Sequence, residues 1–345
     1  MAYENILDDL KRCIALETPS RVPCFPLGLE FDIRDSGFTH RQFRDNPEVM
    51  VQVGLNAVKR YDYDWYILHP DDLIEYEGTG IVIRYDENIP PAVSQYLPAT
   101  ESTLAGLRLP AYPAKGTRMA LHLEGLRGLR TALGSEVCLT GRIAAPFSSV
   151  TLILGVEATL SLMVENPKLL VEFMKSLVEY NDTYAQAQLE AGADAIWLGD
   201  CVATSHFISP EHYKAFAAEY ADKSCRRIQR GGGIVFYHGC ERSIPHLEIM
   251  AELAFDTINI GEGVDIAEVK NAIGSKKCVM GNLDTINVLR EKSAEEVEEE
   301  TKTIVEKGKV GGGYVFCTGE EIPHDTPREN VSAMVKAVRL YGTAC

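Results

Sequence analysis

Three side chains that bind soft metal ions stand at the ends of two apolar segments. Residues 234–240 read Ile-Val-Phe-Tyr-His-Gly-Cys, which places His238 and Cys240 two positions apart, and Cys317 ends a similar run. Residues two apart on an extended strand point to the same face. Imidazole nitrogen and thiolate sulfur are favoured zinc ligands, and a catalytic zinc keeps three protein ligands and one open position. The pattern therefore predicts a metal site made of His238, Cys240 and Cys317.

The same residues also have a structural explanation. Buried cysteines pack like small apolar residues, and H-x-C with one distant cysteine is a weak signal by itself. Cys201 adds another alternative, because it follows a neighbouring predicted strand and could complete a closed, structural Cys3His site. We favour a metal site because its candidates all fall at strand ends.

The elements that must position these residues alternate between strands and helices. Such alternation implies parallel strands joined by right-handed crossovers. Eight strands predict an α/β protein with a closed (β/α)8 barrel, also called a TIM barrel, because an open sheet would carry a nucleotide-binding glycine motif that is absent here. The strands are expected near residues 21, 63, 136, 195, 234, 257, 278 and 314.

The domain organisation follows from this pattern. We expect one barrel domain over residues 1–345, with residues 73–113 as an inserted β-hairpin region that forms a lid or a wall. The hydrophobic spacing predicts helices over 3–16, 43–60, 115–133, 156–190, 209–230, 243–253, 265–274, 285–308 and 327–342.

Composition narrows the class of partner. The 345-residue chain carries 50 acidic and 34 basic residues, a net charge of −16, which disfavours nucleic acid and anionic membranes. No apolar run reaches the roughly 18 residues that span a bilayer, and the N-terminus lacks the features of a signal peptide. Nine cysteines in a long chain fit reduced thiols in a cytoplasmic protein.

Several motifs resemble, in order and over nearly the whole chain, the uroporphyrinogen decarboxylase superfamily, which implies a (β/α)8 barrel. The decarboxylases of that superfamily carry an N-terminal signature of the type RQAGR, whose arginines grip carboxylates, whereas residues 27–34 here read Leu-Gly-Leu-Glu-Phe-Asp-Ile-Arg. The motifs that carry the resemblance are residues 142–147 (RIAAPF), 166–170 (NPKLL), 190–194 (EAGAD), 208–210 (ISP), 238–240 (HGC), 281–284 (GNLD) and 326–330 (TPREN).

A second branch of the superfamily fits better. His238, Cys240 and Cys317 match the pattern of the zinc-dependent corrinoid methyltransferases, which are similar to methylcobamide:coenzyme M methyltransferases. Gly239 and Glu241 replace the apolar residue and the glycine that are usual around the cysteine, which indicates a divergent subgroup and leaves the methyl acceptor open.

This resemblance implies a transferase of the EC 2.1.1 type. Its zinc would keep a small thiol or similar acceptor deprotonated. The thiolate attacks the methyl carbon of methyl-cobalt(III) and releases cobalt(I). The methylcobalamin or other corrinoid is a co-substrate that arrives on a separate corrinoid protein. The oligomeric state is open, a homodimer being one option.

Three further strand-end residues receive roles from the same resemblance. Glu262 would fill the fourth zinc position or stand behind the ligands, and Asp200 and Asn282 would hydrogen-bond the ligand histidine or the substrate. Structural capping explains these three residues equally well. The alternative functions are a demethylase that loads the corrinoid, a decarboxylase-type lyase, and a non-catalytic module with a closed zinc site.

Overall fold

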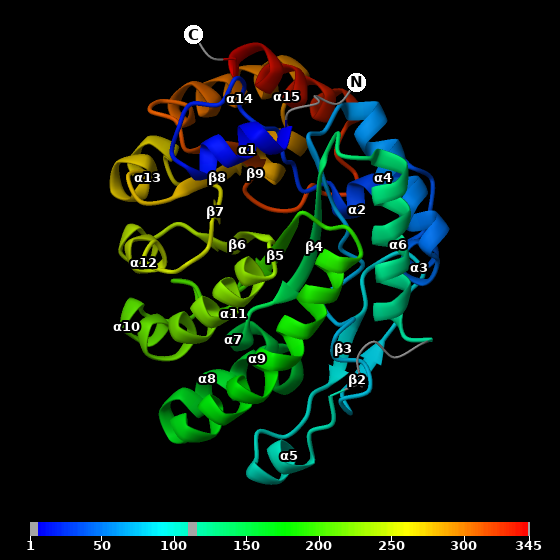
Figure 1. The fold of residues 1–345 in the computed structure, drawn as a ribbon, viewed down its shortest axis with the longest axis vertical. Helices are drawn as coiled ribbons and strands as arrows, with labels where there is room; N and C mark the ends of the chain where they lie inside the picture. Colours follow the sequence, from blue (N-terminus) through cyan, green and yellow to red (C-terminus); the bar gives the residue numbers. More distant parts are fainter. Residues whose placement is uncertain (1–5, 110–115, 344–345) are drawn as a thin grey trace.

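The computed structural model describes residues 6–109 and 116–343 and shows a curled, parallel seven-stranded sheet (Figure 1). The strand order is β1-β4-β5-β6-β7-β8-β9, so each strand pairs with its neighbours in the chain apart from the inserted pair β2 and β3. The strands of the main sheet are β1 (Trp65–Ile67), β4 (Cys138–Ala144), β5 (Ala195–Gly199), β6 (Ile234–Glu241), β7 (Thr257–Ile260), β8 (Cys278–Leu283) and β9 (Tyr314–Thr318).

The strand predicted near residue 21 is reduced to isolated bridges. Cys24 pairs with Phe316 of β9, and the backbone amide of Asp64 donates to the carbonyl of Cys24 at 3.2 Å. The segment therefore lies between β9 and β1, where an eighth strand would stand. Pro23 and Pro26 lack the amide donors that a regular strand needs. The predicted α/β, barrel-like fold is confirmed, but the sheet has seven strands plus this irregular segment instead of eight strands.

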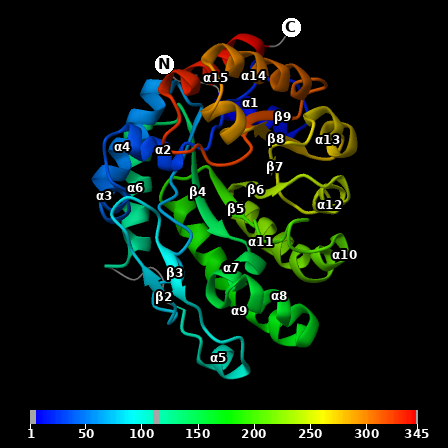
Figure 2. The same ribbon diagram turned by 180° about the vertical axis from the view of Figure 1, so that it is seen from behind.

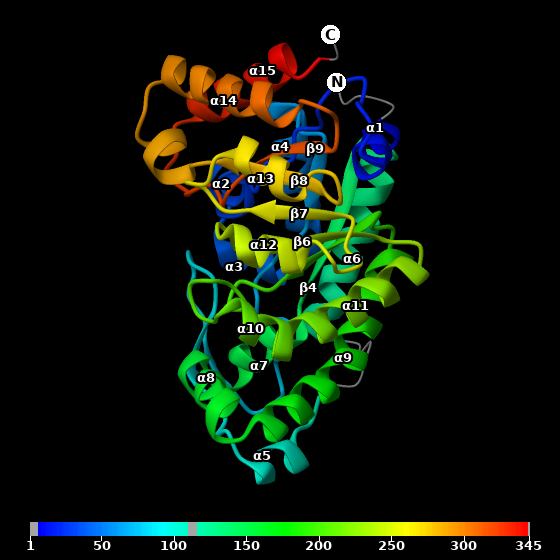
Figure 3. The same ribbon diagram turned by 90° about the vertical axis from the view of Figure 1, so that its left-hand side faces the viewer.

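Helices lie on the outside of the curled sheet, as the front, rear and side views show (Figures 1, 2 and 3). They are α1 (Ile6–Ile14), α2 (Leu29–Asp35), α3 (His40–Asp45), α4 (Pro47–Tyr61), α5 (Glu101–Gly106), α6 (Arg118–Leu133), α7 (Pro146–Leu154), α8 (Val156–Glu165), α9 (Pro167–Glu190), α10 (Pro210–His212), α11 (Ala218–Arg230), α12 (Ile244–Met250), α13 (Ile266–Ile273), α14 (Ala294–Gly308) and α15 (Arg328–Tyr341), with π-helical turns η1 (Tyr213–Ala217) and η2 (Thr285–Arg290). Within the described residues no single helix is long and apolar enough to cross a membrane, and only the bent pair α7 and α8 passes that test jointly.

The helix predicted over residues 156–190 is two helices. Pro167 cannot donate the hydrogen bond that would continue α8. The side chain of Asn166 instead accepts from the amide of Leu169 and begins α9.

The inserted region holds the predicted hairpin, in which β2 (Val82–Arg84) pairs antiparallel with β3 (Ala92–Gln95). The ends of three predicted segments, at residues 3–5, 110–113 and 115, lie outside the described residues.

Aromatic side chains fill the interior of the curled sheet. Phe25 stacks on Trp65 with ring centroids 4.9 Å apart, and Trp65 lies 5.7 Å from Trp197. The indole nitrogen of Trp65 donates to the carbonyl of Pro26 at 2.8 Å, so its one polar atom has a partner. This layer is a solid floor, and any cavity must lie above it, toward the carboxyl ends of the strands.

A buried carboxylate joins the two ends of the fold. Asp64, whose side chain is fully buried, lies 2.5 Å from Arg21 and accepts from Arg339 of α15 at 2.7 Å and from the amide of Cys24 at 2.8 Å. The irregular segment between β9 and β1 is therefore fixed by charge as well as by its bridges.

Replacing Asp64 with alanine should lower the free energy of unfolding by about 3–5 kcal/mol, because two largely buried guanidinium groups would lose their counter-charge. Urea unfolding should show a lower midpoint with an unchanged slope. Glu298→Ala is the matched control, since its contact with Lys336 is on the surface at 3.5 Å and should change stability by less than about 1 kcal/mol. Equal midpoints for the two variants would contradict this account of the closure.

Candidate metal centre

The side chains of Cys201, His238 and Cys240 meet at the carboxyl ends of β5 and β6. Their ligand atoms all lie within 4.8 Å of one another, and Sγ of Cys240 is 3.2 Å from Nε2 of His238. The parallel register sets Gly199 beside His238, so Cys201 follows β5 at the level of the histidine. One imidazole and two sulfurs at this separation fit a zinc ion, the metal that the sequence predicted.

A bulge in β6 gives Cys240 its position. His238 and Glu241 pair with adjacent residues of β7, so the two residues between them have no partner on that strand. Cys240 adopts a left-handed backbone conformation with φ of 50°. A non-glycine residue in that region costs about 1–3 kcal/mol, and such residues cluster at functional sites. Bulges commonly re-aim side chains beside active sites, and this one keeps the sulfur of Cys240 against the histidine.

The orientation of His238 is fixed by an asparagine on the next strand. The side-chain amide nitrogen of Asn259 donates to the carbonyl of Thr318 at 3.2 Å, which leaves its oxygen as an acceptor 2.8 Å from Nδ1 of His238. Nδ1 must therefore carry the hydrogen, and the lone pair of Nε2 is available to a metal. The imidazole also packs on Trp197, with ring centroids 4.6 Å apart.

The three ligand candidates polarise one another. A hydrogen bond from Cys240 lowers the pKa of Cys201, whereas burial raises the pKa of Cys240. Although burial works against protonation, the sulfur of Cys201 raises the pKa of His238 to about 9. Without a metal the group is thus a thiolate beside an imidazolium, and a metal would release the proton of His238 on binding.

Cys317 does not join this group in the structure. It lies on β9 beside Asn282 of β8 and is fully buried among the interior side chains. Burial raises the pKa of its thiol well above the usual value. Of the trio predicted from the sequence, the structure brings His238 and Cys240 together and adds Cys201, and a ligand role for Cys317 stays a prediction.

Asp200 and Asn282 do not contact His238, which corrects their expected role. The carboxylate of Asp200 accepts from the hydroxyls of Ser148 and Tyr237, both at 2.7 Å. Asn282 donates to two backbone carbonyls of the loop after β7, both at 2.9 Å. Each therefore holds a strand end in place, as structural caps do.

Glu262 is only partly engaged. Its Oε1 accepts from Arg242 at 3.1 Å, and its Oε2 is buried without a hydrogen-bond partner among the described residues. Burial raises the pKa of this carboxyl. It is not a member of the metal-competent group, so its predicted place as a fourth ligand is untested.

A cavity of about 290 Å³ opens beside the group and is lined by His238 and Cys201. Three carboxylates also line it, those of Asp72, Glu320 and Glu321. Such walls repel anions and favour neutral or cationic molecules.

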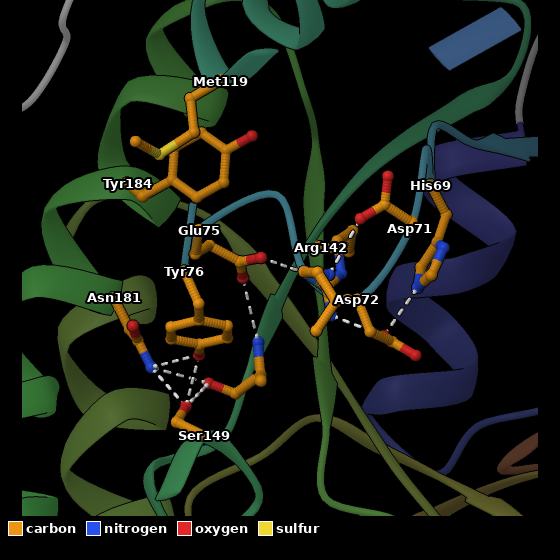
Figure 4. A network of polar contacts seen from close by, with 12 residues as sticks. His69, Asp71, Asp72, Glu75, Tyr76, Met119, Arg142, Ser149, Asn181 and Tyr184 are labelled. Atoms are coloured by element: carbon orange, nitrogen blue, oxygen red, sulfur yellow. Dashed lines mark hydrogen bonds and ion pairs between the residues drawn. The ribbon is translucent and has the colours of Figure 1, made fainter. Parts of the chain in front are cut away.

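The one arginine in the cavity wall is neutralised by its neighbours. Figure 4 shows Arg142 between Glu75 and Asp72, with its Nη2 2.8 Å from Asp72 and its Nη1 bonded to Glu75. His69 lies 3.3 Å from the same oxygen of Asp72. Both terminal nitrogens of Arg142 are thus occupied, and the wall offers an anion no free guanidinium fork.

Comparison with known proteins identifies the family. The model of the family described as uroporphyrinogen decarboxylase (URO-D) matches residues 7–341. The chain belongs to this family. The uroporphyrinogen decarboxylase of Methylococcus capsulatus is 25% identical over 324 residues, which cover 91% of this chain and 89% of that protein.

Solved structures show the same fold in this family and beyond. A methyltransferase from Methanosarcina mazei superposes with a TM-score of 0.88 at 23% identity, covering 97% of this chain and 98% of that one. A B12-independent methionine synthase from Shewanella sp. W3-18-1 has a TM-score of 0.56 at 10% identity, covering 93% and 95%. At these identities the likeness is one of fold.

Sequence reasoning missed several residues of the site. Asn259 carried a signal, because an amide inside a fully buried four-residue strand needs a specific partner. Glu320 and Glu321 follow the end of β9 and satisfy the strand-end rule, but they were overlooked beside Cys317. Cys201 was only an alternative, since its place depends on how its loop folds back.

Replacing Asn259 with leucine should weaken zinc affinity about 10–100-fold, because His238 would lose the acceptor that holds its tautomer. A competition titration with a chromophoric chelator measures this change. Asn259→Asp keeps an acceptor for Nδ1 and should bind zinc nearly as the wild type does. If leucine and aspartate gave the same affinity as asparagine, the histidine would not depend on this bond.

Proposed function

We propose that the protein is a zinc-dependent methyltransferase that moves a methyl group between a protein-bound corrinoid and a small thiol or similar acceptor. The observation that carries the proposal is the group of Cys201, His238 and Cys240 at the mouth of an acid-lined cavity. Membership of an enzyme family supports catalysis, and the fold shared with the Methanosarcina mazei methyltransferase is consistent with methyl transfer.

The chain itself prepares the acceptor site. Bound zinc would act as a Lewis acid that lowers the pKa of the acceptor's thiol. His238 and Cys240 would hold the metal together with a second thiolate, for which the sequence pattern names Cys317. Asn259 keeps Nδ1 of the histidine protonated, and Trp197 supports the ring from below.

The cavity sets the size of what enters. About 290 Å³ accommodates a small thiol, whereas a corrinoid ring is several times larger and must approach from outside the mouth on a partner protein. In the transfer, a sulfur–carbon bond forms as the cobalt–carbon bond breaks, and the electron pair of the broken bond stays on cobalt, which passes from Co(III) to Co(I). The reverse direction, loading the corrinoid from a methylated substrate, uses the same groups.

Decarboxylation is the second candidate, because the curated relatives carry that name. Uroporphyrinogen is a polycarboxylate and needs free cations around it. In this chain Arg142 is neutralised, and Arg34, the one arginine of residues 27–34, donates to Asn88 at 2.8 Å on the surface. The charge of the site therefore favours methyl transfer.

The purified protein should contain about one zinc ion per chain, and His238→Ala, Cys240→Ala and Cys317→Ala should each lose it. Elemental analysis measures the metal, and the absorbance change of methylcobalamin with added thiol measures the transfer, which should fall in parallel. Cys225→Ala is the control, because this cysteine is buried in α11. A wild type without zinc, or release of carbon dioxide from uroporphyrinogen without demethylation, would overturn the proposal.

The charge of the cavity predicts a preference among thiols. Coenzyme M carries a sulfonate, so it should have a KM about fivefold higher than 2-mercaptoethanol, equivalent to a repulsion of about 1 kcal/mol. The double variant Glu320→Gln with Glu321→Gln removes two of the three carboxylates and should narrow that ratio. A lower KM for coenzyme M in the wild type would contradict the electrostatic account.

A further inference from the structure

The loop that carries Cys201 is fastened immediately before this residue. The backbone amide of Asp200 donates to the carbonyl of His238 at 2.8 Å, which ties the end of β5 to the ligand strand. The buried carboxylate of Asp200 accepts from Ser148 of α7 and from Tyr237 of β6. The residue before Cys201 is therefore anchored by both its backbone and its side chain.

The loop is fastened again four residues after Cys201. Ser205 donates to Glu241 twice, from its amide at 2.7 Å and from its hydroxyl at 2.6 Å. The same carboxylate accepts from the amides of Arg242 and Ser243, each at 2.7 Å, and only 1% of Glu241 is exposed. A buried carboxylate with four donors is a strong anchor, and it stands next to Cys240 in the sequence.

The cysteines near the mouth differ in how accessible they are. Cys201 is exposed and lines the cavity, Cys240 is half-buried in the bulge of β6, and Cys317 is fully buried. A thiol that enters the cavity therefore meets Cys201 first. A ligand on a loop can also leave a metal with less disturbance of the fold than a ligand on a central strand.

We propose that Cys201 is an exchangeable ligand of the resting metal centre, that Glu241 positions it, and that the acceptor thiol takes its place. This inference rests on the proposed zinc function. In the exchange, the incoming thiol loses its proton to the sulfur of Cys201, so one metal–sulfur bond forms, one breaks and no external base is consumed. Glu241 is a positioning residue, because it acts only through Ser205 and the loop.

Cobalt(II) in place of zinc reports the number of thiolates through its sulfur-to-metal charge-transfer band. In Cys201→Ser the resting band should fall by the share of one thiolate. Adding 2-mercaptoethanol should raise the band in Cys201→Ser, whereas in the wild type it should leave the band nearly unchanged because one sulfur replaces another. A resting band in Cys201→Ser equal to that of the wild type would overturn the assignment.

Glu241→Gln tests the positioning role. The glutamine amide cannot accept from the backbone amide of Ser205 and an acceptor side chain at once, so the loop should detach and the cobalt band should fall as in Cys201→Ser. Glu219→Gln on the exposed face of α11 is the matched control, and circular dichroism with thermal unfolding checks that the variants fold. A wild-type band in a folded Glu241→Gln would refute the role of Glu241.

The two proposals fail in different ways. If the wild type took up neither cobalt nor zinc, the metal function itself would fall. If it took up cobalt but the band was insensitive to Cys201→Ser, only the exchangeable ligand would fall.

Discussion

The hydrogen bond between His238 and Asn259 is the constraint on which the site depends. A buried imidazole has two nitrogens that could face the cysteines in either tautomer, and the carbonyl of Thr318 removes that freedom by orienting the amide of Asn259. Three strands, β6, β7 and β9, are thereby coupled through one side chain. The left-handed Cys240 then completes a geometry that the strand register alone would not supply. Outer partners of this kind set both the orientation and the basicity of metal ligands.

Charge separates the two chemistries that the family makes plausible. A site for a polycarboxylate would present unpaired arginines, but here Asp72 and Glu75 occupy the terminal nitrogens of Arg142. The carboxylates of Glu320 and Glu321 add further negative charge to the same cavity wall. Soft ligands beside such a wall are suited to binding a thiol on a metal, and they give a decarboxylase substrate little to hold.

Much of the fold was predictable because buried parallel strands read as short apolar runs between helices. The exception is the segment around Pro23, which occupies the place of a strand without its hydrogen bonds. Strand ends also revealed His238 and Cys240. The identity of the third sulfur was not predictable, since hydrophobic patterns do not fix how deep Cys317 sits or how the loop after β5 folds back. That fold depends on Glu241, whose four donors come from two separate segments of the chain.

X-ray absorption at the zinc edge of the purified protein tests the central claim most directly. The account predicts a zinc centre with one imidazole nitrogen and at least two sulfurs in its first coordination shell, at distances of roughly 2.0–2.1 Å and 2.3 Å. A shell of oxygen and nitrogen alone, or the absence of zinc from active protein, would contradict it.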